Sequence, residues 1–456
     1  MVFSSFVFLL LFLPVVLVMY FLCPKKGRNY VLLLVSLIFY GWGEPVYVFL
    51  MIGSIIVAYF LGIWLDKSIS AGKTSIARAI VAIAVVVFMG TMSVFKIGYS
   101  FWGWALPIGI SFFSFQILSY IIDVYRGTTG VQKNPFYLGT YVALFPQLIA
   151  GPIVRYETIA AELENRKETV DDFGAGVSRF VNGLAKKVII ANSVGYIFAQ
   201  IQQLPVEEIS TVTAWISAIA YTFQIYFDFS GYSDMAIGLG RMFGFKFLEN
   251  FKYPYVSKSI TEFWRNWHIS LSSWFRDYVY IPLGGNRCSK VRHIFNLFVV
   301  WALTGLWHGF GWNFLAWGLY YFVLLMVEKF FIGKKLAGLP KIFQHIYTMF
   351  FVIMGWLLFS IEDWGRFVSL FKAMFGFAGG GLADTTAVYY LVNYAGLLIV
   401  AAVVSTPVLR KIGKRLQKRS PLYRNIIVPV GIWVMLILSM ACLAGESFNP
   451  FLYFRF

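Results

Sequence analysis

The sequence predicts an all-α polytopic membrane protein with about 10 to 13 transmembrane helices and with re-entrant or interfacial helices between them. Of its 456 residues, 59% are hydrophobic and 13% are charged, whereas soluble domains average roughly 45–50% apolar and about 25% charged residues. Apolar runs with the length of a membrane span also recur along the whole chain. These observations exclude a soluble enzyme, a disordered chain, a coiled coil and a disulfide scaffold.

Uncharged windows close to 20 residues long mark the candidate spans in order. They are 1–24, 45–65, 97–122, 134–154, 188–206, 209–227, 342–361, 385–409 and 425–445, with shorter windows at 29–43 and 79–95. The longest window, 294–327, is expected to form two helices because Gly309 and Gly311 interrupt it. Window 1–24 contains no basic residue, so we expect an uncleaved first span with its N-terminus outside, not a signal peptide.

The net charge of +17 is explained by membrane topology. Basic residues gather in short loops, so we expect no nucleic-acid partner and a cytoplasmic position for loops 25–28, 67–78, 286–293, 329–341 and 410–424. Charges and apolar runs mix between residues 124 and 285. Polar backbone at membrane depth survives only around a cavity or inside protein. We therefore expect one domain, 1–456, with N-terminal spans 1–133, a catalytic core 134–330 and C-terminal spans 331–456.

Segment 261–287 holds the densest set of polar and aromatic side chains. Read as one helix, it carries two adjacent stripes. One stripe contains Trp264, Trp267, Leu271, Trp274 and Tyr278, and the other contains Thr261, Arg265, His268, Ser272 and Arg276. Glu262 precedes Arg265 by three residues, where an ion pair can form. Because charges facing lipid are costly, this helix either lines a wet cavity that binds polar ligand groups or anchors the chain at the interface.

A lone histidine, His308, lies inside window 294–327. A neutral imidazole accepts a proton near physiological pH, so His308 is a candidate general base. The alternative is a structural role, with a hydrogen bond to Thr304 or to a neighbouring span. Asp228 and Asp234 flank Gly231, where we expect a helix break that is either structural or ligand-binding.

Gln147 and Arg155 lie in a segment with Pro146 and Gly151, which is expected to be kinked or re-entrant. Their role is either structural or ligand-binding. Segment 174–190 is amphipathic and could lie in the cytoplasmic interface. No two of the four histidines share one helix at metal-ligand spacing, and the three cysteines form no paired motif, so we expect no bound metal and no disulfide framework.

Several long motifs resemble the signatures of the membrane-bound O-acyltransferase family and follow one another along the chain in the order found in that family. The two most specific are Glu262–Tyr278 with Pro282–Arg287, and Gly305–Gly309 around His308. Supporting motifs lie at 1–5, 106–112, 119–126, 148–155, 226–240 and 249–251. Within the family, the chain is most similar to the branch that O-acetylates alginate. The similarity is strong over residues 1–330, and Asn266 departs from it because an arginine is common there.

The resemblance implies helices around a cytoplasmic tunnel and an outer funnel that meet near His308. It implies transfer of an acetyl group from cytoplasmic acetyl-CoA, with no other cofactor bound, to a hydroxyl of an extracytoplasmic polysaccharide. It also implies a bacterial cell membrane, contact with membrane lipid and a partner that is an SGNH-type acetyltransferase or an acyl carrier. His308 would be the general base and His268 would orient the reacting groups. The implied substrate and donor site contains Arg265, Arg276, Glu262, Trp264, Trp267, Asp228, Gln147 and Arg155.

Two alternatives stay open at the level of sequence. Composition and number of spans fit a transporter or flippase of a lipid or polysaccharide precursor equally well, with Asp228, Asp234, Glu262 and Arg265 as its coupling or substrate site. An acyltransferase could also carry D-alanine or a long fatty chain, since the width of a tunnel cannot be derived from the sequence.

Overall fold

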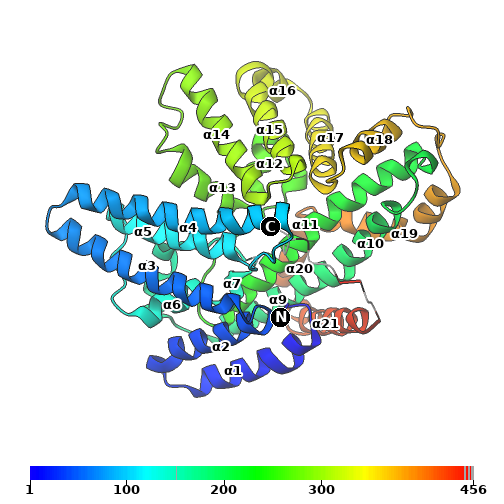
Figure 1. The fold of residues 1–456 in the computed structure, drawn as a ribbon. Helices are drawn as coiled ribbons and strands as arrows, with labels where there is room; N and C mark the ends of the chain where they lie inside the picture. Colours follow the sequence, from blue (N-terminus) through cyan, green and yellow to red (C-terminus); the bar gives the residue numbers. More distant parts are fainter. Residues whose placement is uncertain (150, 446–447, 450–451, 453–456) are drawn as a thin grey trace. The chain divides into compact units, whose positions relative to one another are not determined.

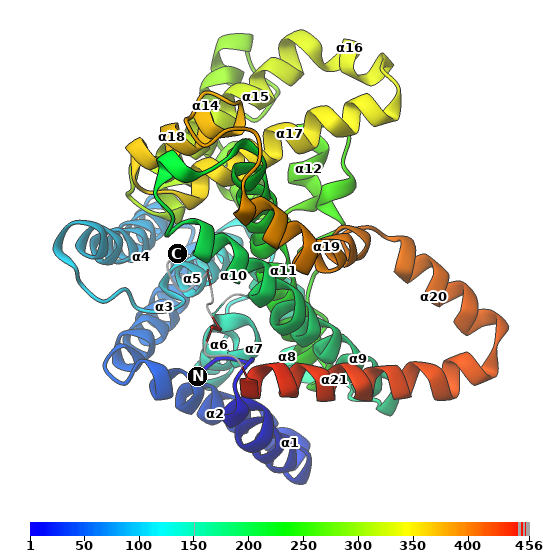
Figure 2. The same ribbon diagram turned by 90° about the vertical axis from the view of Figure 1, so that its right-hand side faces the viewer.

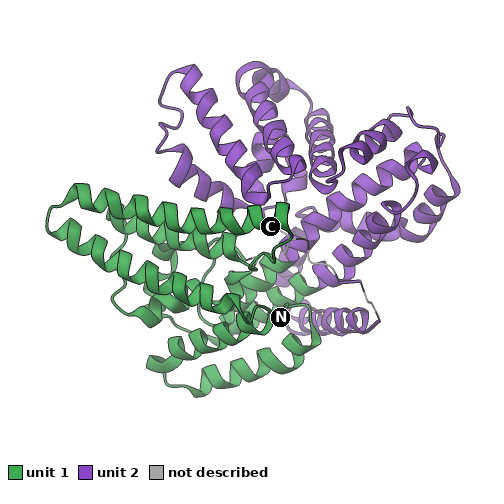
Figure 3. Ribbon diagram, viewed as in Figure 1, with its two compact units in different colours: residues 1–184, 232–249, 453–456 green, residues 185–231, 250–452 purple. Residues whose placement is uncertain are grey.

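The structure is a computed structural model that describes residues 1–149, 151–445, 448–449 and 452 (Figure 1). Across these residues every regular element is a helix and no strand forms. The described residues divide into two compact units (Figure 3). Unit 1 comprises residues 1–184 and 232–249, and unit 2 comprises residues 185–231 and 250–452. The expected division into N-terminal spans, catalytic core and C-terminal spans stays a prediction.

Unit 1 begins with a π-helical stretch, η1 (Val7–Phe12), that continues into α1. Its helices are α1 (Leu13–Leu22), α2 (Arg28–Gly43), α3 (Tyr47–Ser70), α4 (Thr74–Trp102), α5 (Ile110–Arg126), α6 (Pro135–Ala143), α7 (Phe145–Leu148), α8 (Tyr156–Asn165) and α9 (Val170–Ala185). The long helices α3 and α4 lie side by side, and both pack on α5 (Figure 1). The end of α11 also belongs to this unit.

Unit 2 contains the remaining helices. They are η3 (Lys186–Ala191), α10 (Asn192–Ile201), the first part of α11 (Thr211–Met242), α12 (Ile260–Asn266), α13 (Ile269–Phe275), η6 (Arg276–Tyr280), α14 (Lys290–His308), α15 (Trp312–Val327), η7 (Glu328–Ile332), α16 (Gly333–Gly338), α17 (Lys341–Ser360), α18 (Trp364–Met374), α19 (Thr385–Val404), α20 (Val408–Arg419), η8 (Tyr423–Ile427) and α21 (Val428–Gly445). One-turn 3-10 helices lie at Lys25–Gly27, Val206–Glu208 and Pro254–Val256.

Six helices of the described chain are long and apolar enough to cross a membrane, which confirms a polytopic membrane protein. They are Tyr47–Ser70, Thr74–Trp102, Trp312–Gly338, Lys341–Ser360, Thr385–Val404 and Tyr423–Gly445, and Val7–Leu22 is a shorter apolar helix. Six is fewer than the expected number because several apolar windows do not form one uninterrupted helix.

Windows 97–122 and 134–154 show the reason. The first spans the end of α4, a loop and most of α5, since Gly103 and Gly109 both have positive φ angles and stop the helices on either side. The second divides at Leu144, whose ψ of 109° is not helical, immediately before α7. The expected division of window 294–327 is confirmed, with α14 ending at His308 and α15 beginning at Trp312.

Helix α11 corrects another expectation, because it continues without interruption from Thr211 to Met242. The sequence pattern predicted a break at Gly231. Glycines here serve close packing instead: a Cβ added at Gly238 would lie 2.7 Å from the backbone oxygen of Gly176 on α9. The same helix pair is joined by Arg179, which donates hydrogen bonds to Asp234 and Glu249. Arg179 therefore does not extend toward an interface as an unpaired cation.

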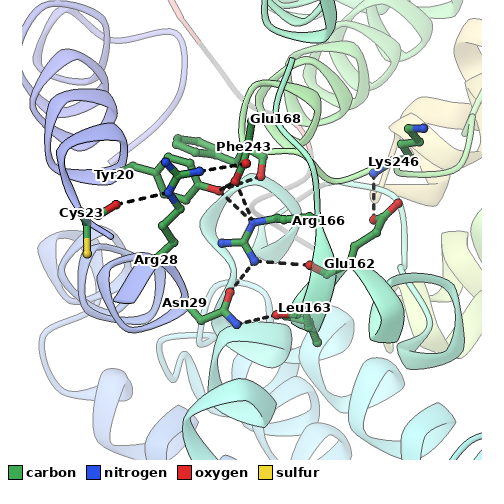
Figure 4. Close-up of polar contacts among 10 residues, drawn as sticks. All are labelled: Tyr20, Cys23, Arg28, Asn29, Glu162, Leu163, Arg166, Glu168, Phe243 and Lys246. Carbon is green, nitrogen blue, oxygen red and sulfur yellow. Dashed lines mark hydrogen bonds and ion pairs between the residues drawn. The ribbon is translucent and has the colours of Figure 1, made fainter. Parts of the chain in front are cut away.

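A polar cluster ties the first two helices of unit 1 to the loop after α8 (Figure 4). Arg28 forms an ion pair of 2.8 Å with Glu168, and the Tyr20 hydroxyl donates a hydrogen bond to the same carboxylate. The Nε of Arg166 donates to the Tyr20 hydroxyl at 2.8 Å. Burial alone would raise the pKa of Glu168, but the hydrogen bonds from Tyr20 and Arg28 outweigh it and hold that pKa below its usual range.

Replacement of Glu168 by Gln should cost about 1–3 kcal/mol of stability at pH 7, since hydrogen bonds to a charged group are lost. A carboxyl with a lowered folded-state pKa stabilises the fold above its unfolded pKa of about 4.3. That contribution is lost as pH falls through the folded-state value, so wild type and Glu168→Gln should converge in acid. Thermal unfolding in detergent from pH 7 to pH 3 measures this. The exposed Glu164→Gln is the control, and a pH-independent difference for Glu168→Gln would contradict the assignment.

Candidate functional site in unit 2

The N-terminus of α12 is held by two carboxylates and a hydroxyl. Glu328, buried at the start of η7, accepts hydrogen bonds from the backbone N–H groups of Ile260 (2.6 Å) and Thr261 (2.9 Å). The Ser259 hydroxyl accepts from the N–H of Glu262, whose carboxylate accepts from the N–H of Lys258. This is a variant of the capping box. The expected Glu262–Arg265 ion pair is absent from the described residues, and Glu262 caps the helix instead.

The segment read as one helix is two helices separated by His268. Its backbone is left-handed (φ 44°), which ends α12 and redirects the chain into α13. Asn250 supports this turn, because its backbone oxygen accepts from Ile269 N–H and its side-chain oxygen accepts from Ser270 N–H. The two predicted stripes therefore do not form on a single continuous surface.

Asn250 also fixes the tautomer of His268. The Asn250 Oδ1 lies 3.1 Å from Nδ1 of His268 and already accepts hydrogen bonds from Ser270. An oxygen can only accept, so Nδ1 of His268 carries the proton. Burial lowers the pKa of His268 to about 3. His268 is therefore a neutral imidazole with a defined orientation at physiological pH.

His308 is the last residue of α14, in a hairpin formed with α15. The two helices approach closely because glycines face each other's backbone: a Cβ on Gly305 would lie 2.6 Å from the oxygen of Phe314, and one on Gly318 would lie 2.5 Å from the oxygen of Trp301. Asn313 donates from its amide to the Phe359 oxygen and ties this hairpin to α17. His308 is 5% exposed.

Aromatic rings surround both histidines and bring them to one place. The indole of Trp307 lies 4.8 Å from the His308 ring and 6.2 Å from the His268 ring, measured between centroids. Phe229 meets His268 edge-on at 4.7 Å, and Trp317 and Phe359 contact His308 at 5.1 and 5.2 Å. The structure thus places the two predicted catalytic histidines close to one indole, that of Trp307.

An aromatic cluster extends from His308 toward α12. Trp317 contacts Trp264 at 5.5 Å and Trp356 at 6.1 Å, and Trp356 contacts Trp267 at 4.6 Å. Trp264 also meets Tyr321 and Trp301, each at 4.8 Å. Trp264 and Trp267 therefore contact the rings around His308, although they no longer share one helix face.

A pocket of about 520 Å³ lies at the other side of α12. Its polar lining includes Lys258, Glu262, Arg265, Glu328 and Lys329, and its apolar lining includes Leu297, Leu325 and Leu336. Both carboxylates already accept backbone hydrogen bonds at the start of α12. Within the described residues, neither Lys258 nor Arg265 forms an ion pair. The pocket thus combines available positive charge with an apolar wall, a composition suited to an anionic amphiphile.

Two other predicted residues of unit 2 are already engaged. Arg276 is exposed and forms a bidentate pair with the adjacent Asp277, at 2.6 and 2.9 Å. Asp228 is buried and forms an ion pair of 2.7 Å with Lys187, which also donates to Asn192. The second oxygen of Asp228 accepts from the N–H of Leu452. Their proposed contacts with substrate stay predictions.

Gln147 and Arg155 belong to unit 1. Gln147 is fully buried on α7, and its amide donates to the backbone oxygen of Tyr141. Arg155 pairs with Glu157 at 3.7 Å. Their part in binding stays a prediction.

Sequence reasoning missed several residues of this site. Asn250 and Glu328 were not considered as site residues, and Lys258 and Lys329 were not assigned to a pocket. A buried carboxylate at the end of an apolar helix is a signal that could have identified Glu328, because such a group needs donors from elsewhere in the fold. Nothing local in the sequence indicates that those donors belong to α12.

The sequence of the chain is similar to those of known membrane proteins. The model of the membrane-bound O-acyltransferase family matches residues 82–364. The chain is 38% identical to a protein of Pseudomonas putida named probable alginate O-acetylase AlgI, with all of both chains covered. It is 31% identical to a Helicobacter pylori peptidoglycan O-acetyltransferase, over 84% of this chain and 81% of that protein. It is also 31% identical to a Bacillus subtilis teichoic acid D-alanyltransferase, over 56% of this chain and 68% of that protein.

The buried Lys187–Asp228 pair generates a prediction about stability. Asp228→Asn leaves a buried ammonium without its counter-charge and should cost about 3–5 kcal/mol. The double variant Lys187→Met with Asp228→Leu removes both charges and should regain most of that loss. Chemical unfolding of the three proteins in detergent measures the difference. If Asp228→Asn were as stable as wild type, the pair would have no structural role.

Proposed function

Because this chain belongs to the membrane-bound O-acyltransferase family and is an acyltransferase, we propose that it moves an acetyl group from cytoplasmic acetyl-CoA to a hydroxyl of an extracytoplasmic polysaccharide. The observation that carries this proposal is His308, a buried imidazole at the end of α14, surrounded by aromatic rings and sharing Trp307 with His268. Family membership favours acyl transfer over the alternative of a transporter or flippase.

The donor binds with its phosphates in the pocket beside α12. Lys258 and Arg265 supply positive charge there, and guanidinium groups match phosphate oxygens in geometry. The apolar lining accommodates the pantetheine arm. Trp264, next to Arg265 in the chain, belongs to the aromatic cluster that reaches His308. The acetyl thioester then lies toward the histidine while the charged end of the donor stays in the pocket.

In the reaction, His308 takes the proton of the acceptor hydroxyl as its oxygen attacks the thioester carbonyl. The new C–O bond forms, the C–S bond breaks, and the proton passes from the imidazolium to the departing thiolate. Because His308 ends α14, the carbonyl end of that helix stabilises the positive charge that develops on its ring. His268, held neutral by burial and oriented by Asn250, positions the acceptor, and the surrounding rings keep water from hydrolysing the thioester.

The acceptor chemistry follows the named relatives, which include a probable alginate O-acetylase and a peptidoglycan O-acetyltransferase. We therefore assign a polysaccharide hydroxyl as the final acceptor. Delivery proceeds through an extracytoplasmic partner, an SGNH-type acetyltransferase or an acyl carrier, whose hydroxyl or thiol receives the acetyl group first.

His308→Ala should reduce acetyl transfer by about 10²–10⁴-fold, the usual contribution of a general base. The measurement follows labelled acetyl groups from acetyl-CoA into protein, polysaccharide and acetate in membranes that contain the protein. His345→Ala is the matched control, since His345 lies on α17, where its Nδ1 is 3.3 Å from the backbone oxygen of Ser257. Wild-type transfer by folded His308→Ala would remove His308 from the mechanism.

Arg265→Gln and Lys258→Gln should each raise KM for acetyl-CoA roughly tenfold with little change in kcat, since they remove a charge-assisted contact to the donor. Acetyl-dephospho-CoA, which has one phosphate fewer, tests the contact directly. If that phosphate contacts the replaced residue, the substitution should raise KM less for acetyl-dephospho-CoA than for acetyl-CoA. The exposed Lys334→Gln controls for net charge. An unchanged KM in both variants would move the donor phosphates out of this pocket.

A further inference from the structure

Helix α20 exposes its whole surface. None of its residues is buried, and the apolar Val408, Leu409, Ile412 and Leu416 are 40–51% exposed. Six of its twelve residues are basic: Arg410, Lys411, Lys414, Arg415, Lys418 and Arg419. A helix that shows apolar side chains to solvent on one side and cations on the other needs an environment that accepts both.

The two kinds of side chain are segregated around the helix axis. At about 100° per residue, the four apolar side chains fall within one arc of roughly 100°. Arg410, Lys411, Lys414 and Lys418 occupy the opposite side, and Arg415 borders the apolar arc. Arg419, the last residue of the helix, falls within that arc. This is the pattern of a helix that lies in the plane of a membrane interface, with apolar side chains among the acyl chains and basic ones among the headgroups.

The chain on both sides of α20 keeps it near a membrane surface. Three residues, 405–407, connect it to the span that ends at Val404, and three more, 420–422, connect it to the span that begins at Tyr423 (Figure 2). Three extended residues reach at most about 10 Å. Both ends of a helix about 18 Å long are therefore held close to the ends of two spans, which favours an orientation along the surface.

Counter-charges for α20 are missing from its own surroundings. The sequence contains no Asp or Glu from Thr385 to Gly445. In the part of the chain that the structure describes, no ion pair involves a basic residue of α20, whose neighbours are α19 and η8. Negative charge must come from outside the chain, and phosphate headgroups at the surface to which α20 is tethered supply it.

We propose that α20 is an interfacial helix that binds anionic phospholipids of the cytoplasmic leaflet. Leu409, Ile412 and Leu416 insert below the headgroups, and Lys411, Lys414 and Lys418 contact their phosphates. This binding is independent of acyl transfer, and it gives the protein a preference for anionic membrane regions.

The experiment uses the full chain with its three cysteines replaced by serine and a single cysteine introduced for a fluorescent label. Leu409→Cys and Leu416→Cys report on the apolar side, and Lys411→Cys and Lys418→Cys report on the basic side. The protein is reconstituted in vesicles of phosphatidylcholine with or without phosphatidylglycerol. Quenching by nitroxide-labelled lipid and by aqueous acrylamide measures the position of each label.

With phosphatidylglycerol present, lipid quenching should be several-fold stronger at Leu409 and Leu416 than at Lys411 and Lys418. The difference should shrink in pure phosphatidylcholine, in high salt and in a triple variant with Lys411→Gln, Lys414→Gln and Lys418→Gln. The triple variant Lys25→Gln, Lys26→Gln and Lys73→Gln removes equal charge elsewhere and should not change it.

Equal lipid quenching on both sides, or quenching that does not depend on phosphatidylglycerol, would overturn the proposal. A label on the apolar side that stays accessible to acrylamide in vesicles but becomes protected in native membranes would overturn it in favour of an acidic protein partner.

Discussion

The carboxylate of Glu328 at the start of α12 is the interaction on which the rest of the site depends. A helix of seven residues has few internal hydrogen bonds, and its first N–H groups need acceptors from elsewhere. Glu328 supplies them from η7, which follows α15 directly. The position of α12 relative to α15 then determines where Trp264 and Trp267 lie, and the turn after α12 determines where His268 lies.

Other buried polar groups of unit 2 likewise have partners from elsewhere in the chain. The side-chain oxygen of Asn250 satisfies three donors around the turn at His268, and Asp228 satisfies Lys187 and a backbone N–H. Each of these groups would cost several kcal/mol if it were buried without a partner. Polar side chains in this apolar chain therefore fall into two sets. One set holds backbone turns and helix ends in place, and the other, which includes Lys258 and Arg265, stays available to a ligand.

Composition and helix-breaking residues were sufficient to predict a helical membrane protein and the hairpin at Gly309–Gly311. We predicted that His268 and His308 belong to one site. In the structure the rings of both histidines lie near the indole of Trp307. What could not be predicted was the conformation of residue 268, because the left-handed backbone is imposed by Asn250, eighteen positions away in sequence. A periodicity argument assumes an uninterrupted helix, so it merged α12 and α13. The break expected at Gly231, between Asp228 and Asp234, does not form, and α11 continues to Met242.

The ion pair between Lys187 and Asp228 has a consequence for the order of synthesis. Lys187 is made forty-one residues before Asp228, and an isolated ammonium in the bilayer costs about 2.5–3.5 kcal/mol on insertion scales. Segment 186–201 therefore lacks its counter-ion when it leaves the ribosome and gains it only after the first part of α11 has been made. The buried position of Lys187 is therefore favourable only once the first part of α11 is present, so η3, α10 and α11 are expected to assemble together.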